Sequence, residues 1–245
     1  MTLPKIETPT HELTLPSANV QVKYRPFTIG EEKILLQALE TGTESSMQQA
    51  LKDIVNACTF GALDGGTMPT FDLEYVFLQI RAKSVGEIAK LRLLCPDDKE
   101  TYGEAEIDLT KVDVQVDDKH TNKIVIDEKR NFGLLMKYPT IDSISPRQAV
   151  AKLKTNELFD MIANCIKEVY DGEKVFKVED YSKEELHSWF ESMNKDTFNQ
   201  INAFFDTMPA LEHTIYVTNP KTKVENKIVL KGAQDFFGLP SLTKA

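Results

Sequence analysis

Residues 20–39, VQVKYRPFTIGEEKILLQAL, predict a strand that leads directly into a capped helix. The first five residues alternate between apolar and polar, which is the period of a half-buried strand. Pro26 ends that pattern. Thr28 and Glu31 have the spacing of a capping box, so a helix is expected to begin after Thr28. Nothing in this stretch has the chemistry of an active site, and we interpret it as scaffold.

Composition excludes some classes of partner. The 245 residues carry a formal net charge of -9 at pH 7, and 41% of them are hydrophobic, enough for one large or two small packed domains. The negative charge argues against general binding to nucleic acid or to an anionic membrane, since each phosphate contact needs a Lys or Arg. No apolar run has the length of a signal peptide or a membrane span. We expect a soluble, cytosol-made protein that binds neither nucleic acid nor membrane.

Three segments are expected along the chain. Residues 1–19 contain three prolines and predict an extended arm, which either docks on a partner or is an ordinary frayed terminus. Residues 20–140 predict the opening strand, a helical block and a run of short antiparallel strands. Residues 141–245 predict a second helical block, followed by a β-hairpin and an aromatic tail.

The second helical block is predicted from spacing and caps. Residues 145–153, SPRQAVAKL, begin with Ser and Pro at the first helical positions. Residues 156–172, NELFDMIANCIKEVYDG, repeat apolar residues every three and four positions and predict one amphipathic helix. Ser182 and Glu185 repeat the capping-box spacing. The expected fold class is therefore α+β, with helical blocks that are each followed by antiparallel β-hairpins.

Two polar loops suggest a weak internal repeat. Residues 95–98, CPDD, and residues 219–222, NPKT, each contain a proline and each connect an apolar strand to a return strand. Both follow a block of helices, so a unit of helices plus hairpin can be read twice along the chain. Two unrelated hairpins explain the same pattern.

Residue types that catalyse reactions or bind metals lack the necessary spacing. Cys95-Pro96 looks like half of a zinc knuckle, but Asp98 stands where a second cysteine would be needed, and no matching Cys or His pair follows. The four histidines share no metal-ligand spacing, and phosphate-binding glycine loops and nucleophile elbows are absent. We predict no catalytic, cofactor-binding or metal-binding residues and no cofactor. The three widely spaced cysteines are expected to be reduced.

Four ordered strings carry a family resemblance. They are VKYRPFTIGEEKILLQALE, CTFGALD, FDLEYVFLQIRAKSVGE and MKYPTID. Together, from the N-terminal arm to the GAQDFFG tail, the chain resembles the baseplate hub protein family of T4-like contractile-tailed bacteriophages. The resemblance implies a baseplate hub subunit or a factor that assembles the hub, with no enzymatic activity. Some relatives have Cys-Pro-x-Cys where this chain has residues 95–98, so a metal role does not carry over.

The leading hypothesis is a non-enzymatic structural or assembly component of a contractile phage tail baseplate hub. The alternatives are a hub assembly catalyst or chaperone absent from the mature virion, an uncharacterised enzyme that uses loop carboxylates, and a zinc-stabilised module. Expected partners are other phage baseplate or tail hub proteins, and the chain can be oligomeric in the assembled baseplate. It would lie in the host cytoplasm during assembly, and in the virion tail baseplate if incorporated.

Two sets of residues are candidates for contacts with a partner. The first set lies where the arm enters the helical block and would determine where the arm meets a neighbour: Tyr24, Arg25, Pro26 and Phe27. The second set lies in the tail, where aromatic residues could anchor a partner: Phe236, Phe237 and Leu239. The alternative for the tail is that it folds back on the protein's own helices.

Overall fold

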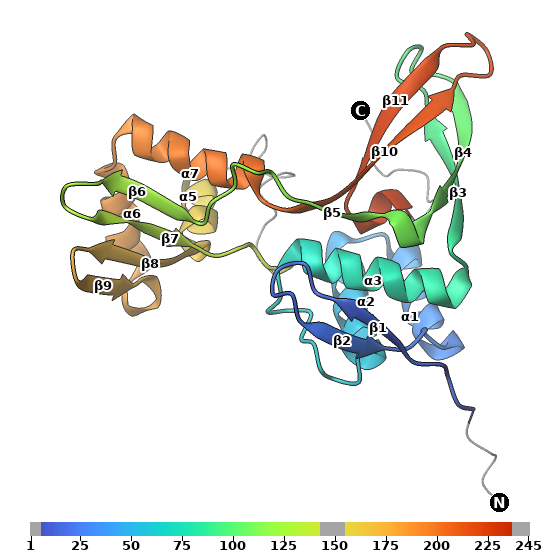
Figure 1. The fold of residues 1–245 in the computed structure, drawn as a ribbon, viewed down its shortest axis with the longest axis horizontal. Helices are drawn as coiled ribbons and strands as arrows, with labels where there is room; N and C mark the ends of the chain where they lie inside the picture. Colours follow the sequence, from blue (N-terminus) through green and yellow to red (C-terminus); the bar gives the residue numbers. More distant parts are fainter. Residues whose placement is uncertain (1–5, 143–154, 237–245) are drawn as a thin grey trace, which may run out of the picture. The chain divides into compact units, whose positions relative to one another are not determined.

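The computed structural model describes residues 6–142 and 155–236 as an α+β protein, which confirms the predicted fold class (Figure 1). The chain divides into two compact units. Unit 1 comprises Met1–Gln115 and Ala210–Ala245, and unit 2 comprises Val116–Pro209. Unit 2 is thus inserted into unit 1, a division that differs from the expected segments 1–19, 20–140 and 141–245. The physical reason is strand pairing, because the chain returns after unit 2 to pair with a strand that precedes it.

Unit 1 begins with a small hairpin and three helices. These elements are β1 (His11–Thr14), β2 (Gln21–Tyr24), α1 (Ile29–Thr41), α2 (Glu44–Cys58) and α3 (Thr70–Val85). The β1 and β2 strands pair antiparallel, so residues 11–14 of the expected arm belong to a sheet. The turn between them is held to α3, because the Ser17 N–H donates to the carboxylate of the buried Asp72 (3.1 Å).

The rest of unit 1 consists of two small sheets. One pairs β3 (Ile88–Leu94) with β4 (Tyr102–Asp108), and the other has the order β11 (Glu225–Lys231), β10 (Ala210–Thr218) and β5 (Asp113–Gln115). Short 3-10 helices follow β4 and β11 at Leu109–Lys111 and Ala233–Phe236. The predicted hairpins are confirmed. They share one core with α3, whose buried members include Leu78, Leu91, Ile107, Val217 and Phe236.

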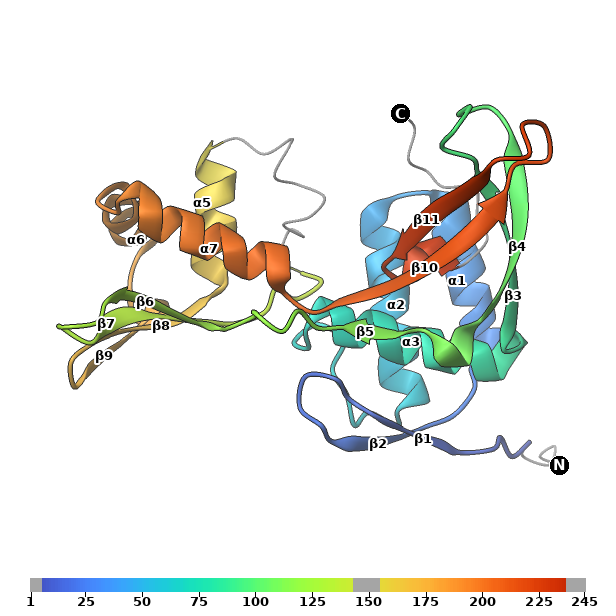
Figure 2. The ribbon, with the colours of Figure 1, turned by 45° about the horizontal axis from the view of Figure 1, so that its top comes forward.

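Unit 2 is a four-stranded antiparallel sheet with helices on one face (Figure 2). Its order is β6 (Lys123–Asp127), β7 (Phe132–Met136), β8 (Ile166–Asp171) and β9 (Lys174–Lys177). The helices are α5 (Thr155–Asn164), α6 (Lys183–Glu191) and α7 (Lys195–Thr207), with a 3-10 turn at Val178–Asp180. The capping box predicted at Ser182 and Glu185 begins α6.

The predicted helix over residues 156–172 is wrong in its second half. The helix ends at Asn164, and residues 166–171 form strand β8 between β7 and β9. The Lys137 N–H donates to the Cys165 carbonyl (2.7 Å), which brings the chain beside β7. Gly172, with φ 63°, lies in the tight turn to β9. Hydrogen bonding to the neighbouring strands β7 and β9 outweighs the helical preference that the apolar spacing indicates. The helix predicted at 145–153 lies outside the described residues.

All three cysteines are buried free thiols, as expected from their spacing. In the described part of the chain, no helix is long and apolar enough to cross a membrane.

The sheet of unit 2 requires a residue without a side chain at position 133. A Cβ atom on Gly133 would lie 2.2 Å from the Ile124 carbonyl oxygen and 2.3 Å from the Tyr170 hydroxyl oxygen. The first of these atoms belongs to the backbone of the neighbouring strand, so it cannot move without disturbing the strand pairing.

Replacing Gly133 should therefore destabilise the protein. Gly133→Ala is expected to lower the free energy of unfolding by about 1–3 kcal/mol, as overpacking does in cores, measured by chemical denaturation of the full chain. The control is Gly30→Ala in α1, where the nearest atom to the added Cβ is 3.6 Å away. That variant should be neutral or slightly stabilising. Equal stability of the Gly133 variant and the wild type would contradict the close packing.

Candidate functional site

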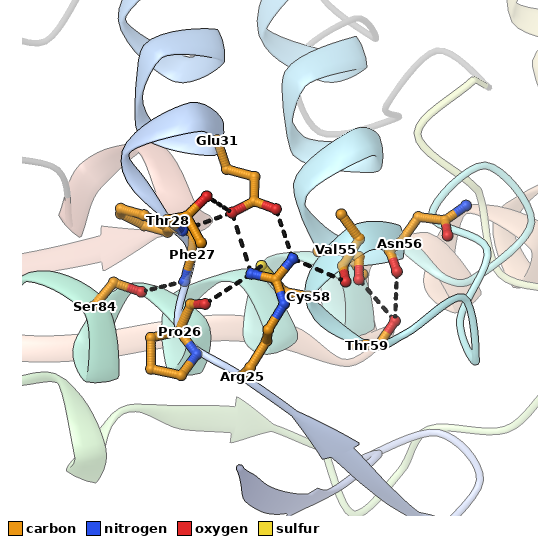
Figure 3. A network of polar contacts seen from close by, with 11 residues as sticks. Arg25, Pro26, Phe27, Thr28, Glu31, Val55, Asn56, Cys58, Thr59 and Ser84 are labelled. Carbon is orange, nitrogen blue, oxygen red and sulfur yellow. Dashed lines mark hydrogen bonds and ion pairs between the residues drawn. The ribbon is translucent and has the colours of Figure 1, made fainter. Parts of the chain in front are cut away.

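The junction between β2 and α1, which contains the first set of predicted contact residues, is a dense polar network (Figure 3). The Arg25 guanidinium makes a two-pronged contact with the Glu31 carboxylate, with N···O distances of 2.6 and 3.1 Å. It also donates to the carbonyls of Pro26 (3.0 Å) and Ala57 (3.4 Å). The paired side chains of Arg25 and Glu31 are only 17% and 14% exposed. This junction therefore ties the end of β2 to both α1 and α2.

The same junction also reaches α3. The Phe27 N–H donates to the Ser84 hydroxyl (2.9 Å), and that hydroxyl donates to the Ile80 carbonyl within α3 (2.6 Å). The Arg25 N–H donates to the Cys58 carbonyl at the end of α2 (2.9 Å). Residues 25–27 thus form hydrogen bonds with groups of all three helices. These bonds define the backbone conformation between β2 and α1.

The Arg25–Glu31 ion pair changes the pKa of the Glu31 carboxyl group. The Arg25 hydrogen bond lowers the pKa of Glu31 from 4.5 to about 2, and bonds from Thr28 contribute to the shift. The Thr28 N–H donates to the same carboxylate at 2.6 Å, which completes the predicted capping box. Burial raises the pKa of the neighbouring Cys58 thiol to about 11, so it is not activated as a nucleophile. The network is a structural clamp without reactive groups.

The predicted contact residues differ in their accessibility. Tyr24 is 3% exposed and Phe236 is 0% exposed, so both side chains pack within the protein. Pro26 and Phe27 are half-buried. Phe237 and Leu239 lie outside the described residues. Contact of this set with a partner stays a prediction.

The two Pro-containing loops share one backbone hydrogen bond and one left-handed residue. In the first, the Lys99 N–H donates to the Cys95 carbonyl (2.9 Å), and Lys99 has φ 55°. In the second, the Lys223 N–H donates to the Asn219 carbonyl (2.9 Å), and Lys223 has φ 65°. The loops differ in length, because the Cys95 N–H donates to the Thr101 carbonyl (2.8 Å) and the Asn219 N–H donates to the Val224 carbonyl (2.9 Å).

These turns also meet in space through Asp97. Its carboxylate accepts hydrogen bonds from the Asn219 side-chain amide (2.9 Å) and the Thr222 hydroxyl (2.5 Å), and its N–H donates to the Asn226 side chain (3.1 Å). The bond from Thr222 is the main reason that the pKa of Asp97 is lowered. We call the contact between residues 95–101 and 219–226 the turn clasp. It joins the ends of the hairpins β3–β4 and β10–β11.

The turn clasp does not have the donors of a zinc site. The first and fourth residues of the two turns are Cys95, Asp98, Asn219 and Thr222, so a single thiol is present. Burial and the nearby carboxylates raise the pKa of that thiol, which disfavours the thiolate that zinc requires. The Asp98 carboxylate is occupied within its own turn, where it accepts from the Thr101 hydroxyl (2.6 Å). In the part of the chain that the structure describes, no three His, Cys, Asp or Glu side chains form a group that could hold a metal.

Unit 2 contains a pocket of about 370 Å³ that sequence reasoning missed. At its wall, the His187 ring nitrogen Nε2 lies 3.0 Å from the Asp160 carboxylate. The two residues are 27 positions apart on α6 and α5, so no local spacing could have indicated the pair. The lining residues include no Ser, Thr or Cys that this pair could activate.

The comparisons with known proteins agree with a structural role. A family model described as T4 bacteriophage base plate protein matches residues 8–238, which covers segments of both units. The chain belongs to the T4 bacteriophage base plate protein family. No curated protein and no solved structure matches it. Membership in this family indicates a structural role in the phage tail base plate, among other base plate components.

The Arg25–Glu31 pair gives this base plate protein a pH-dependent contribution to stability. Because the pKa of folded Glu31 is about 2 and the ordinary value is 4.5, the contribution is complete above pH 4.5 and is lost as the pH falls towards 2. Glu31→Gln should lower the free energy of unfolding at pH 7 by about 1–3 kcal/mol. The difference between variant and wild type should shrink on acidification.

The matched control for this measurement is Glu32→Gln. Glu32 also lies in the first turn of α1, but it is exposed. Its replacement tests the helix-dipole effect alone, which is worth less than about 1 kcal/mol. Equal losses in the two variants at pH 7 would show that the ion pair adds nothing beyond that effect.

The turn clasp can be tested by amide hydrogen exchange. Asp97→Ala removes the acceptor for Asn219 and Thr222, so the backbone amides of residues 219 and 221–224 should exchange faster than in the wild type. Asp117→Ala, in a loop of unit 2, should leave these amides unchanged. Unchanged exchange in the Asp97 variant would mean that each turn is ordered without the other.

Proposed function

We propose that this chain is a component of the hub of a contractile-tail base plate and that it acts through protein–protein contacts. The observation that carries the proposal is the family match over residues 8–238, which covers nearly all the described residues. The geometry supports it, because the polar clusters of unit 1 are hydrogen-bonded clamps between elements of the fold. The proposed partners are other hub proteins, met in the host cytoplasm during assembly.

The contact region is proposed to include the N-terminal segment and the residues that hold it. Residues 6–10 lead into β1 and are exposed, with Ile6 93% exposed. The clamp at Arg25 holds β2, which pairs with β1, in a constant position. In this proposal, a partner recognises residues 6–10, which extend from the β1–β2 hairpin. Pro26 and Phe27, which are half-buried, lie at the base of this hairpin.

Two measurements test the proposal. If the chain is a hub subunit, mass spectrometry of purified phage particles should detect it in every preparation. An assembly factor that is absent from mature particles would instead be found with hub proteins in infected-cell lysate only. That outcome would overturn the structural-subunit proposal, while keeping a role in assembly.

The second measurement concerns the arm. Deleting residues 1–10 removes the segment before β1 and leaves the β1–β2 pairing intact. We expect reduced recovery of hub proteins in a pull-down with this variant, at a melting temperature equal to that of the full chain. A deletion of residues 1–19 is less informative because it also removes β1 and uncovers Val22 and Tyr24, which are buried. Full recovery of partners with the shorter deletion would show that the arm makes no contact.

A further inference from the structure

The pocket of unit 2 is surrounded by lysines from separate parts of the chain. Lys137 follows β7, Lys167 lies in β8, Lys177 ends β9, and Lys183 begins α6. Their convergence is produced by the fold, because the first and last of them are 46 positions apart in the sequence and the four share no motif. A cluster of cations on one pocket is unexpected in a chain whose net charge is -9.

Two of these lysines already have carboxylate partners. The Lys177 ammonium lies 3.8 Å from Glu179, and the Lys183 ammonium lies 3.8 Å from Asp160. Such long, exposed pairs are worth little, typically less than about 1 kcal/mol. They leave both ammonium groups able to interact with a further anion.

The other two lysines are free to bind an anion. Within residues 6–142 and 155–236, no carboxylate lies within ion-pair distance of Lys137 or Lys167. Both side chains are exposed at the pocket. One acidic lining residue, Glu168, also has no basic partner at that distance in this part of the chain. The unpaired charge of the pocket is therefore positive.

The Asp160 carboxylate lies at the pocket wall with both oxygens in contact with other side chains. It contacts His187 on one oxygen (3.0 Å) and Lys183 on the other (3.8 Å). Beside these polar groups, the lining includes apolar side chains, among them Ile166, Val178 and Leu186. The site thus combines apolar surface with cationic groups, a combination that suits a short peptide with both apolar and acidic side chains.

We propose that this pocket binds an acidic segment of a partner protein, with Lys137 and Lys167 contacting its carboxylates. The inference rests on the proposed function, in which the chain works by contacts with other base plate proteins. A peptide is favoured over nucleic acid because three carboxylates also line the pocket, and a continuous row of phosphates would be repelled by them and by the acidic protein as a whole. Discrete carboxylates can be placed against individual lysines.

The test uses the full ¹⁵N-labelled chain and a blocked tetra-glutamate peptide as the probe. Amide shifts in the NMR spectrum should concentrate on the pocket, at residues 163–168 and 177–187. Blocked tetra-glutamine should cause no such shifts, because it lacks charge. Shifts spread evenly over the surface, or no shifts in the pocket, would overturn the proposal.

A pair of double variants with the same charge change gives the control. Lys137→Gln with Lys167→Gln should weaken peptide binding at least about fivefold. Lys119→Gln with Lys129→Gln, which alters two exposed lysines of unit 2 outside the pocket, should change it less than twofold. Equal weakening in both would show general electrostatic attraction only and would overturn the site. The shift map of the wild type decides the question if a variant fails to fold.

Further probes separate this proposal from others. A twelve-residue oligothymidine that bound the pocket more tightly than the peptide would overturn the assignment to a protein segment. The titration uses the isolated chain, so it can fail while the chain is still found in phage particles. Conversely, absence from particles and from hub complexes would defeat the proposed function even if the peptide binds.

Discussion

The ion pair between Arg25 and Glu31 is the contact on which the arrangement of unit 1 depends. It joins the end of the opening hairpin to the first turn of α1, and the same guanidinium reaches the last residues of α2. The Phe27 N–H donates a hydrogen bond to the Ser84 hydroxyl, which extends the junction to α3. Removing one partner would leave a largely buried charge and several carbonyl groups without their donor, which costs more than the loss of one exposed pair.

A second constraint comes from the way the chain returns to unit 1. Strand β10 lies between β11 and β5, and therefore links residues on both sides of the inserted unit. The turn clasp adds a side-chain link, because Asp97 binds residues more than 120 positions away. Hydrogen bonds between two similar turns hold the hairpin ends together without a metal, and the donors present would not favour zinc.

Polar contacts link the elements of unit 1 at several points. The polar networks are satisfied within the protein, and in the described residues no buried side-chain polar atom lacks a partner. Burial raises the pKa values of the Cys58 and Cys165 thiols to about 11 and 12, so these two thiols are not activated as nucleophiles. The structural role indicated by the family fits this arrangement. The lysine-lined pocket of unit 2 then becomes a place for recognition of a partner.

Local sequence determined the features that depend on near neighbours. The strand before Pro26, the capping boxes at Thr28 and Ser182, and the hairpin strands follow from spacing over a few residues. Tertiary structure decided the rest. Residues 166–171 became a strand because β7 and β9 supplied hydrogen-bond partners that helical spacing cannot reveal. The contacts Asp160–His187 and Asp97–Thr222 join residues that are 27 and 125 positions apart, and only the folded chain brings such groups within hydrogen-bond distance.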